Sequence, residues 1–485
     1  MTVFAKRLQL VMLGLLLVAA PLSASADSKR SNVVIADGKG KGSFKLLGHN
    51  SLGNRGMNAA LAVRGDYVYI GSRTDGGAKP FENGVKVVDI SNPKKPQVVH
   101  MIGRPYENNE GETSRELRIW PEKDLLIVMN LGSNCSELIH ECSPRSVDDN
   151  IRFYDISGKN AAKPKFISEY KPSENPHEMF LWDDPRRPGR ALLFLSTPGG
   201  DRGQLLVTDI SKARKDKFVE VAKENFIVGE QGNDNRLHSL TVSPDGKRAY
   251  LAYLEAGFLV ADTTDFARAE KKPRVRLITP PKKAPNWAEE IGPGAHSAAP
   301  LFGSDYVLVT DEVYGEALRP LDSGGCPWGW TRMLDVRKPQ KPKVVAQYKL
   351  PQNDPDYCTR DVPRPSSSYS AHNLTLTEHL AFVTWHSAGL QAIDISRPQK
   401  PAESASFKPD PPLLVQQEDP ALSAGQDKVV MWSFPIIQDG LIYVVDVRNG
   451  LYILKYRGPY EKEVARLGFL EGNSNLGAAV KLQER

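Results

Sequence analysis

One short phrase recurs along this chain and restricts the folds open to it. A strand-like apolar run ends in Asp, usually followed by Ile or Val and then Ser or Thr. Six copies occur, and successive Asp residues are 66, 54, 53, 73 and 59 positions apart. The repeated aspartates are Asp89, Asp155, Asp209, Asp262, Asp335 and Asp394. A repeat of this length predicts either a solenoid or a β-propeller.

The strand content of each repeat favours the propeller. The sixth repeat contains four strand-like segments, namely His372–Glu378, His379–His386, Gly389–Ser396 and Ala402–Lys408. Turn residues such as Ser243-Pro244-Asp245-Gly246 separate the first two segments of a repeat. The chain contains 39 Gly and 36 Pro, with 40% hydrophobic residues, which is typical of a folded chain with many short strands. Four antiparallel strands per repeat predict a propeller blade.

A seventh repeat lacks its last strand. It begins at Trp432 and continues with Gly450–Arg457, where Tyr452–Lys455 replaces the Asp phrase. A spare strand, Ser43–Gly48, precedes the first repeat and resembles the outer strands of the others. We therefore predict an all-β, seven-bladed propeller over residues 27–460, with its ring closed by this N-terminal strand. Residues 461–485 form a C-terminal tail in this interpretation.

The repeats carry a family resemblance. The stretch Gly389–Pro401, and related stretches starting at Gly84 and Gln204, resemble the LVIVD repeat of secreted bacterial β-propellers. The resemblance spans most of the chain after residue 26. It implies a propeller architecture but no particular activity, so function has to be argued from the residues.

The N-terminus has the pattern of a cleaved signal peptide over residues 1–26. Lys6-Arg7 precedes the apolar run Leu8–Ala20, and Ala24-Ser25-Ala26 is a small-residue cleavage site. An uncleaved anchor is the alternative. We expect a periplasmic or extracellular protein without a later membrane span. The net charge of +5 falls to +3 without Lys6 and Arg7, which is too weak to indicate a nucleic-acid partner.

Long insertions are expected on one face of the ring, here called the top face, where chains enter the inner strands and pass from second to third strands. These insertions are Asn134–Asn150, Val313–Gly329, Pro351–Ser370 and Pro409–Lys428. Long loops on one face of a rigid scaffold favour a binding surface over random drift of insertions. We expect a monomer that binds a protein or small molecule there.

The four cysteines agree with export. Cys135 and Cys142 lie in one insertion, whereas Cys326 and Cys358 lie in two neighbouring insertions. We predict the disulfides Cys135–Cys142 and Cys326–Cys358, because neither pair has the close spacing of a structural zinc site, which is the rival interpretation.

Histidines recur at the first position of the inner strands. The seven positions in order are Asn58, Arg115, His177, His238, His296, His372 and Trp432. His386 ends the second strand of the sixth blade and is expected in the same region. Because inner strands line the central channel, these five histidines should lie at its top mouth.

Two interpretations of the histidines stay open. Imidazoles on adjacent blades can bind one copper or zinc ion, giving a metal-binding protein or a metal-dependent oxidoreductase or hydrolase. This arrangement is similar in concept to the histidine-rich propeller mouth of the selenium-binding protein and methanethiol oxidase family, without a shared motif. Alternatively, the ring nitrogens hold the loop that leads into each blade through hydrogen bonds to the backbone.

Other candidate residues surround the histidines. We expect Arg115, Glu178, Asp311, Glu312, Trp385 and Trp432 at the top-face binding region. The sequence lacks the Gly-x-Ser-x-Gly, Walker A, Gly-x-Gly-x-x-Gly and His-Glu-x-x-His motifs, so the enzyme classes that use them lose their main support. The leading hypothesis is an exported propeller scaffold that binds a ligand through its top face. The alternative is a metalloenzyme.

Overall fold

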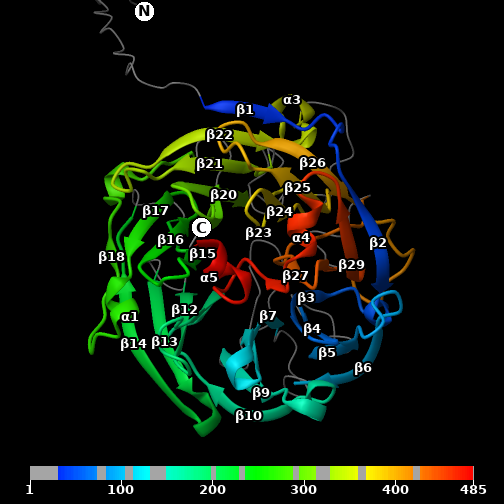
Figure 1. Ribbon diagram of the computed structural model, residues 1–485, viewed down its shortest axis with the longest axis vertical. Coiled ribbons are helices and arrows are strands. Elements are labelled where there is room, and N and C mark those ends of the chain that lie inside the picture. The colour runs from blue at the N-terminus through cyan, green and yellow to red at the C-terminus, as the bar shows by residue number, and fades with distance from the viewer. Residues whose placement is uncertain are drawn as a thin grey trace, which may run out of the picture.

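A computed structural model shows seven sheets arranged in a ring (Figure 1). It describes residues 31–483 apart from 74–83, 104–112, 132–148, 198–203, 229–234, 288–293, 313–327, 359–367 and 419–426. Six sheets contain four antiparallel strands that are consecutive in the chain. The seventh combines three consecutive strands with one strand from the N-terminal segment. Two of the seven sheets carry a fifth strand. The protein is therefore a seven-bladed β-propeller, as the repeats predicted.

The strands of the first four blades follow the chain in order. Blade one contains β3 (Asn58–Arg64), β4 (Tyr67–Ser72), β5 (Val85–Asp89) and β6 (Gln97–Ile102). Blade two contains β7 (Thr113–Trp120), β8 (Leu125–Leu131), β9 (Asn150–Asp155) and β10 (Lys165–Tyr170). Blade three contains β11 (Glu178–Asp183), β12 (Ala191–Thr197), β13 (Gln204–Lys212) and β14 (Lys217–Asn225). Blade four contains β15 (Ser239–Val242), β16 (Arg248–Tyr253), β17 (Gly257–Asp262) and β18 (Arg276–Leu277).

The last three blades include strands from both ends of the chain. Blade five contains β19 (Gly294–Pro300), β20 (Tyr306–Glu312), β21 (Thr331–Asp335), β22 (Lys343–Lys349) and β1 (Asn32–Ile35). Blade six contains β23 (Leu374–Leu376), β24 (Leu380–Thr384), β25 (Leu390–Asp394) and β26 (Ala402–Phe407). Blade seven contains β27 (Ile436–Gln438), β28 (Leu441–Asp446), β29 (Gly450–Arg457), β2 (Ser43–Asn50) and β30 (Phe469–Leu470).

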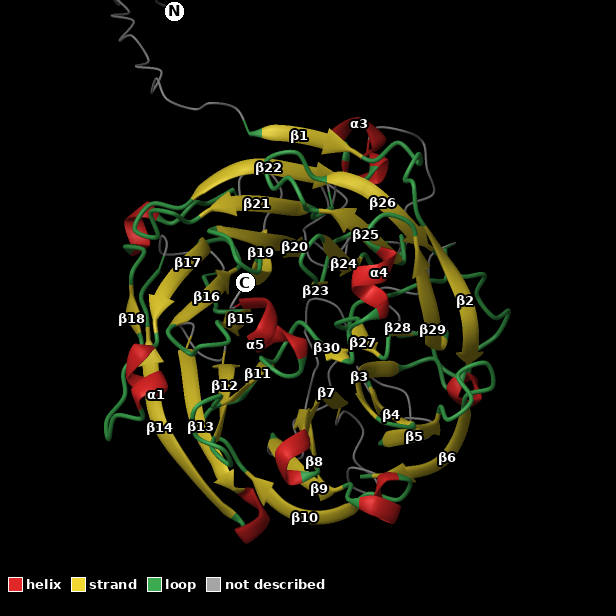
Figure 2. Ribbon diagram, viewed as in Figure 1, coloured by secondary structure: helices red, strands yellow, loops and turns green. Residues whose placement is uncertain are grey.

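The helices among the described residues are short, and all but α5 lie between strands in the chain (Figure 2). The α-helices are α1 (Thr264–Arg268), α3 (Pro355–Cys358), α4 (Glu461–Ala465) and α5 (Ala478–Gln483). The 3-10 helices are η1 (Leu52–Asn54), η2 (Pro121–Lys123), η3 (Gly158–Ala161), η4 (Ala213–Lys215), η5 (Pro281–Lys283) and η7 (Pro351–Asn353). Within the described ranges, no helix has the length and apolar character needed to cross a bilayer.

The repeated Asp phrase has a structural role in every blade that carries it. In each copy, a side-chain oxygen of the Asp accepts a hydrogen bond from the backbone N–H two residues later, as in Asp89 with Ser91 at 2.8 Å. This local turn ends the third strand and directs the chain to the fourth. The phrase recurs because each blade needs this turn, which explains why it predicts architecture and not activity.

The N-terminal segment closes the ring. β2 pairs antiparallel with β29, from Ser43 opposite Arg457 to Asn50 opposite Leu451, and so supplies the missing outer strand of blade seven. Before that, β1 pairs in parallel with β22 on the outer edge of blade five. Figure 1 shows this segment running along the rim from β1 to β2. The closure was predicted from the sequence, whereas the parallel strand β1 was not.

The C-terminal tail closes one end of the channel. β30 pairs with β27, the inner strand of blade seven, and places Leu470 opposite Ile437 inside the ring. The chain then crosses to β11 in blade three, where Asn473 O accepts a hydrogen bond from Leu181 N at 3.1 Å. Figures 1 and 2 show α5 within the ring, well inside the blades. The tail meets the lower half of β11, so it lies at the end opposite His177.

Apolar side chains fill the spaces between neighbouring blades. Separate clusters of buried residues join blades one and two, two and three, three and four, four to six, six and seven, and seven and one. Leu470, Leu482 and Leu476 of the tail belong to two of these clusters. The propeller core therefore extends around the ring, while polar side chains occupy the channel.

Candidate metal centre

Strand direction brings the candidate residues to one end of the channel. Inner strands start at the top face and second strands end there, because successive strands of a blade are antiparallel. The residues that gather at this end are His177 before β11, His238 before β15, His296 in β19, His372 before β23, Glu312 at the end of β20 and His386 after β24. Five of the nine histidines of the chain therefore lie at this end, and they come from four consecutive blades.

The five imidazole rings form a continuous series. Neighbouring ring centroids are 4.5 Å apart for His177 and His238, 4.0 Å for His238 and His296, and 3.9 Å for His296 and His372. His386 continues the series at 5.1 Å from His372. All but His177, which is partly exposed, are buried. The sequence placed these histidines at the channel mouth, and the structure brings their rings together there.

Glu312 lies at the centre of the series. Its Oε2 is 3.5 Å from His238 Nε2 and 3.4 Å from His296 Nε2, and its Oε1 is 2.8 Å from His372 Nε2. Only 3% of Glu312 is exposed to solvent. The sequence marked Glu312 as a top-face residue but not as a ligand. The sequence contained a sign of this role. Glu312 ends the second strand of its blade, and His386 follows the second strand of the next blade, so the two residues occupy similar places.

The tautomer of His372 is fixed by the hydrogen bond that its Nδ1 makes. Nδ1 lies 2.5 Å from the backbone oxygen of Trp432, and a carbonyl oxygen only accepts, so Nδ1 carries the proton. In neutral His372, Nε2 therefore has a lone pair directed at the carboxylate of Glu312. Neither His372 Nε2 nor Glu312 Oε1 has a hydrogen-bond partner among the described residues. Two acceptor atoms 2.8 Å apart repel each other unless a proton or a metal ion lies between them.

Two further rings are oriented in the same way. His296 Nδ1 lies 2.7 Å from Ser297 Oγ, and His386 Nδ1 lies 3.0 Å from Ser368 Oγ. Metal-binding histidines usually engage one ring nitrogen with a hydroxyl, carbonyl or carboxylate, which directs the other nitrogen at the metal. The sequence did not single out these two serines, because a serine beside a histidine is too common to be a signal.

Four of the five histidines lie where the protonated form is disfavoured. Burial lowers the pKa of His177, His238, His296 and His386 well below the ordinary value, and neighbouring positive groups such as Arg115 lower it further for the first three. A neutral imidazole has a free lone pair, which is the form that binds metal ions. Within the described residues, three overlapping groups have ligand atoms within 4.8 Å of one another: His177, Glu178 and His238; His238, His296 and Glu312; and Glu312, His372 and His386.

The remaining sector of the mouth is cationic and aromatic. The guanidinium of Arg115 lies 3.1 Å from His177 Nε2, 3.5 Å from Glu178 Oε1 and 5.0 Å from the ring centre of Trp432. Arg73 lies 5.1 Å from the same indole. Arg115, Glu178 and Trp432 therefore all adjoin the histidine series. The mouth therefore has two chemically different halves. Blades three to six contribute the histidines and Glu312, and blades one, two and seven contribute the arginines and Trp432.

Glu178 is buried beside Arg115 and close to Glu116 and Arg118. Burial raises its pKa to about 8, and the negative charge of Glu116 adds to the shift while Arg115 opposes it. Glu116 in turn accepts a hydrogen bond from Arg118 at 2.7 Å. Glu178 thus lies between the histidine series and a buried ion pair further down the channel.

Asp311 and Trp385, two of the expected top-face residues, lie outside the histidine series. Asp311 accepts hydrogen bonds from Trp287 Nε1 at 2.6 Å and Arg332 Nε at 2.9 Å. The indole N–H of Trp385 donates to the backbone oxygen of Tyr369 at 2.7 Å, and its ring lies in the core. Asp311 precedes Glu312 within β20, and successive side chains of a strand point to opposite sides, whereas Trp385 follows the end of β24 and precedes His386.

Several sequence predictions fall on residues that the structure does not describe. Cys135, Cys142 and Cys326 lie outside the described ranges, and Cys358 ends α3, so both disulfides stay predictions. Most of Asn134–Asn150 and Val313–Gly329 also lies outside them, as do the central parts of the two insertions that lead into blades six and seven.

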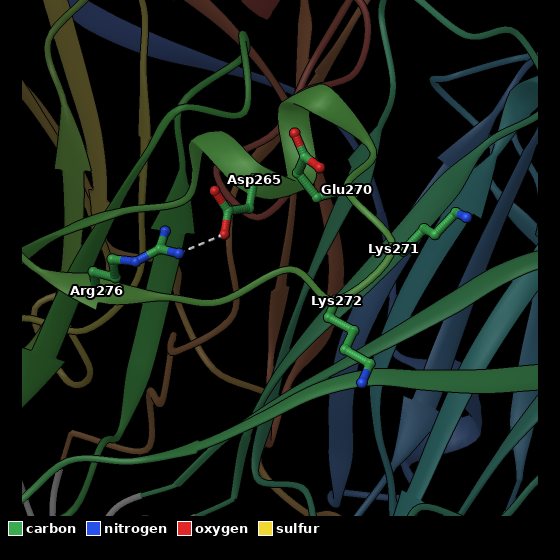
Figure 3. A pocket seen from close by; sticks show the side chains of 5 residues that line it. All are labelled: Asp265, Glu270, Lys271, Lys272 and Arg276. Atoms are coloured by element: carbon green, nitrogen blue, oxygen red, sulfur yellow. Dashed lines mark hydrogen bonds and ion pairs between the residues drawn. The ribbon is translucent and has the colours of Figure 1, made fainter.

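A hollow on the outside of blade four is unrelated to the channel mouth. Figure 3 shows its lining residues Asp265, Glu270, Lys271, Lys272 and Arg276. Asp265 and Arg276 form an ion pair at 2.8 Å across it, and Arg276 belongs to the outer strand β18. The hollow carries charges of both signs and lacks the convergent ligand atoms of the histidine series.

Comparison with solved structures returns chains of low sequence identity. Chaetomium thermophilum Sqt1 bound to the N-terminus of the ribosomal protein L10 has a TM-score of 0.46 and 16% identity, over 85% of this chain and 90% of that chain. Saccharomyces cerevisiae Sqt1 has a TM-score of 0.49 and 9% identity, over 85% and 99%. The Pseudomonas aeruginosa periplasmic gluconolactonase PpgL has a TM-score of 0.44 and 11% identity, over 83% and 96%. Likeness at this level carries no information on function.

Comparison of sequences identifies the repeat itself. No curated protein matches the chain. The LVIVD repeat profile matches residues 55–102, which span blade one, and residues 370–408, which span blade six. These matches confirm the resemblance drawn from the repeated phrase. The protein is a seven-bladed β-propeller whose first and sixth blades match the LVIVD repeat.

Proposed function

We propose that the protein is an exported metalloprotein that binds copper or zinc at the top mouth of its channel and uses this metal centre for its chemistry. Glu312 and the surrounding imidazoles are the ligands. Imidazole and carboxylate donors without a described thiolate suit Zn²⁺ and Cu²⁺. Of the two hypotheses from the sequence, the geometry thus favours the metalloprotein over the plain scaffold.

One observation carries this proposal. His372 Nε2 and Glu312 Oε1 are 2.8 Å apart without hydrogen-bond geometry, and the proton of His372 is held on the other ring nitrogen by Trp432. Loop-holding histidines would direct both nitrogens at backbone groups. A cation between nitrogen and carboxylate explains the contact, and three more neutral imidazoles supply further ligands.

The architecture of the channel supports access from the top face only. The tail from β30 to α5 occupies the other end, where Asn473 and Asn475 bind the backbone of β11. A ligand or substrate would therefore reach the metal through the loop-rich face. There the metal would act as a Lewis acid if it is zinc, or as a redox centre if it is copper.

Metal analysis tests the proposal directly. The protein starting at Asp27, prepared without a histidine tag, is stripped with chelator and titrated with Zn²⁺ and Cu²⁺ by calorimetry, and bound metal is counted by mass spectrometry. We expect at least one equivalent to bind, and His372→Ala or Glu312→Gln to weaken binding by about tenfold or more. His379→Ala is the matched control, because His379 pairs with Glu463 at 2.7 Å away from the cluster.

The outcomes are unambiguous when folding is checked by circular dichroism. Folded wild-type protein that binds neither metal would overturn the proposal. Binding that is equally strong in the His372 and Glu312 variants and in the control would also overturn it, because the metal would then lie elsewhere.

A second candidate function is protein binding through the top face. Leu413 and Leu414 are 95% and 81% exposed. Their segment is held in place, because Arg448 donates to Pro412 O at 2.7 Å and Gln416 N donates to Asn54 O at 2.7 Å. Two exposed leucines on an anchored loop are typical of a contact surface. A partner isolated with the wild type should lose affinity for Leu413→Ser/Leu414→Ser, and undiminished affinity would exclude this surface.

A further inference from the structure

We propose that Glu312 bridges two metal ions, so that the channel mouth holds a dinuclear centre. One ion is bound by Glu312 Oε2 with His238 and His296, and the other by Glu312 Oε1 with His372 and His386. This inference rests on the proposed metal-binding function and extends it by stating the stoichiometry and the ligands of each ion.

The two oxygens of Glu312 face different imidazoles. Oε2 has the Nε2 atoms of His238 and His296 at 3.5 and 3.4 Å, whereas Oε1 has His372 Nε2 at 2.8 Å. Two groups of convergent ligand atoms follow, and Glu312 is their common member. A carboxylate that offers one oxygen to each of two ligand sets is positioned as a bridge.

Each ligand set is small. The first contains His238, His296 and Glu312, and the second contains Glu312, His372 and His386. Each set offers only two imidazoles and one carboxylate oxygen, which leaves a coordination position for solvent or substrate, as in catalytic zinc sites.

Each set also has its own support. His296 Nδ1 is held by Ser297 in the first set, and His372 and His386 are held by Trp432 and Ser368 in the second. His386 has a backbone φ of 29°, and so does Leu254 at the corresponding position after β16, so this conformation belongs to the turn of the blade. The ring centroid of His386 lies 5.1 Å from that of His372.

Electrostatics predicts that the two ions bind unequally. Two divalent ions a few ångströms apart repel each other strongly in a buried site, and within the described residues the shared carboxylate of Glu312 is the ligand that offsets this repulsion. The second ion should therefore bind more weakly than the first. Loss of the Glu312 charge should affect both ions, whereas loss of His386 should affect one.

Titration with Cu²⁺ under the same conditions as above tests the bridge, with electron paramagnetic resonance as the second readout. Wild type should bind two equivalents in two steps, and its integrated signal should fall well below two spins, because bridged Cu²⁺ ions couple magnetically. His386→Asn, in which Asn tolerates positive φ, should bind one equivalent and show about one spin. His386→Gly serves as a second variant that accepts this backbone, and His379→Ala should behave as wild type.

Each result separates this inference from the one it rests on. One equivalent in wild type, unchanged in both His386 variants, would overturn the dinuclear centre and leave a mononuclear one. Two equivalents that give two full uncoupled spins would place the ions apart and overturn the bridge. No bound metal would overturn both proposals.

Discussion

The side-chain amide of Asn475 pairs with both backbone groups of Asp183. Asn475 Oδ1 accepts a hydrogen bond from Asp183 N at 2.8 Å, and its Nδ2 donates to Asp183 O at 2.8 Å. Asp183 ends the inner strand β11, so a residue near the C-terminus completes the hydrogen bonding of a strand 292 positions earlier. The tail is thus fixed to blade three by specific hydrogen bonds.

We expect Asn475→Ala to lower the free energy of unfolding by about 1–3 kcal/mol, because it leaves the amide of Asp183 without its partner at a partly buried site. Chemical denaturation of variant and wild type measures this difference. Deletion of residues 469–485 should have a larger effect, since Leu470, Leu476 and Leu482 are buried. If both variants unfold at the wild-type midpoint, the tail does not stabilise the ring.

A second prediction concerns the N-terminal strands. A protein starting at residue 51 lacks β2, which exposes the edge of β29 and removes Phe44 from its contact with Tyr456, where the ring centroids are 5.8 Å apart. We expect a clear fall in melting temperature and faster proteolysis. A protein starting at residue 37 lacks only the four-residue strand β1 and should melt close to wild type. Equal melting of all three proteins would contradict the role of β2 in closure.

The blades and the position of the histidines were predictable because both follow from a repeat. The Asp phrase marks the third strand of each blade, and counting back from it places the inner strands. The first residues of those strands then meet at the mouth by geometry alone. Ser43–Gly48 could be assigned to blade seven because that blade lacked its outer strand.

The remaining features have no periodic signal. The tail contacts β27 and β11 mainly through its own backbone and through Asn475, and such contacts leave no pattern in the sequence. Glu312 occurs in one blade only, so no column revealed it. Strand alternation could have separated Glu312 from Asp311, because neighbouring residues of a strand face opposite sides.

Arg332 is predicted to be a strong determinant of stability. It is buried, donates to Asp311 Oδ2 at 2.9 Å and lies between Trp287 and Trp330, at 4.8 and 4.7 Å from their ring centres. Arg332→Met leaves the carboxylate of Asp311 buried without its cation, which should cost about 3–5 kcal/mol.

Two comparisons test the role of Arg332. The double variant Arg332→Met/Asp311→Asn should recover part of the loss, because it removes the uncompensated charge. Arg337→Met should change stability little, since Arg337 pairs with Asp335 at the surface, where solvent screens the interaction. Denaturation midpoints measure all three variants. A loss in Arg332→Met no larger than that in Arg337→Met would show that the buried pair does not stabilise blade five.

Asp446 should make the stability of the protein depend on pH. Burial raises the pKa of this carboxyl from 3.8 to about 6, although backbone N–H groups of Asn449, Val430 and Arg448 donate to it and oppose the shift. The folded state therefore holds the proton more tightly than the unfolded state. The stabilisation from this group is complete below about pH 4 and is lost as the pH rises through 6, with a total of about 3 kcal/mol.

The comparison of wild type with Asp446→Asn isolates this effect, because the variant keeps the shape of the side chain but cannot titrate. The difference in free energy of unfolding between the two proteins should shift against the wild type as the pH rises from 4 to 7, at up to about 1.4 kcal/mol per pH unit. Urea denaturation at several pH values measures it. A difference that does not vary with pH would mean that Asp446 has the same pKa in the folded and unfolded states, and that its three backbone hydrogen bonds fully offset its burial.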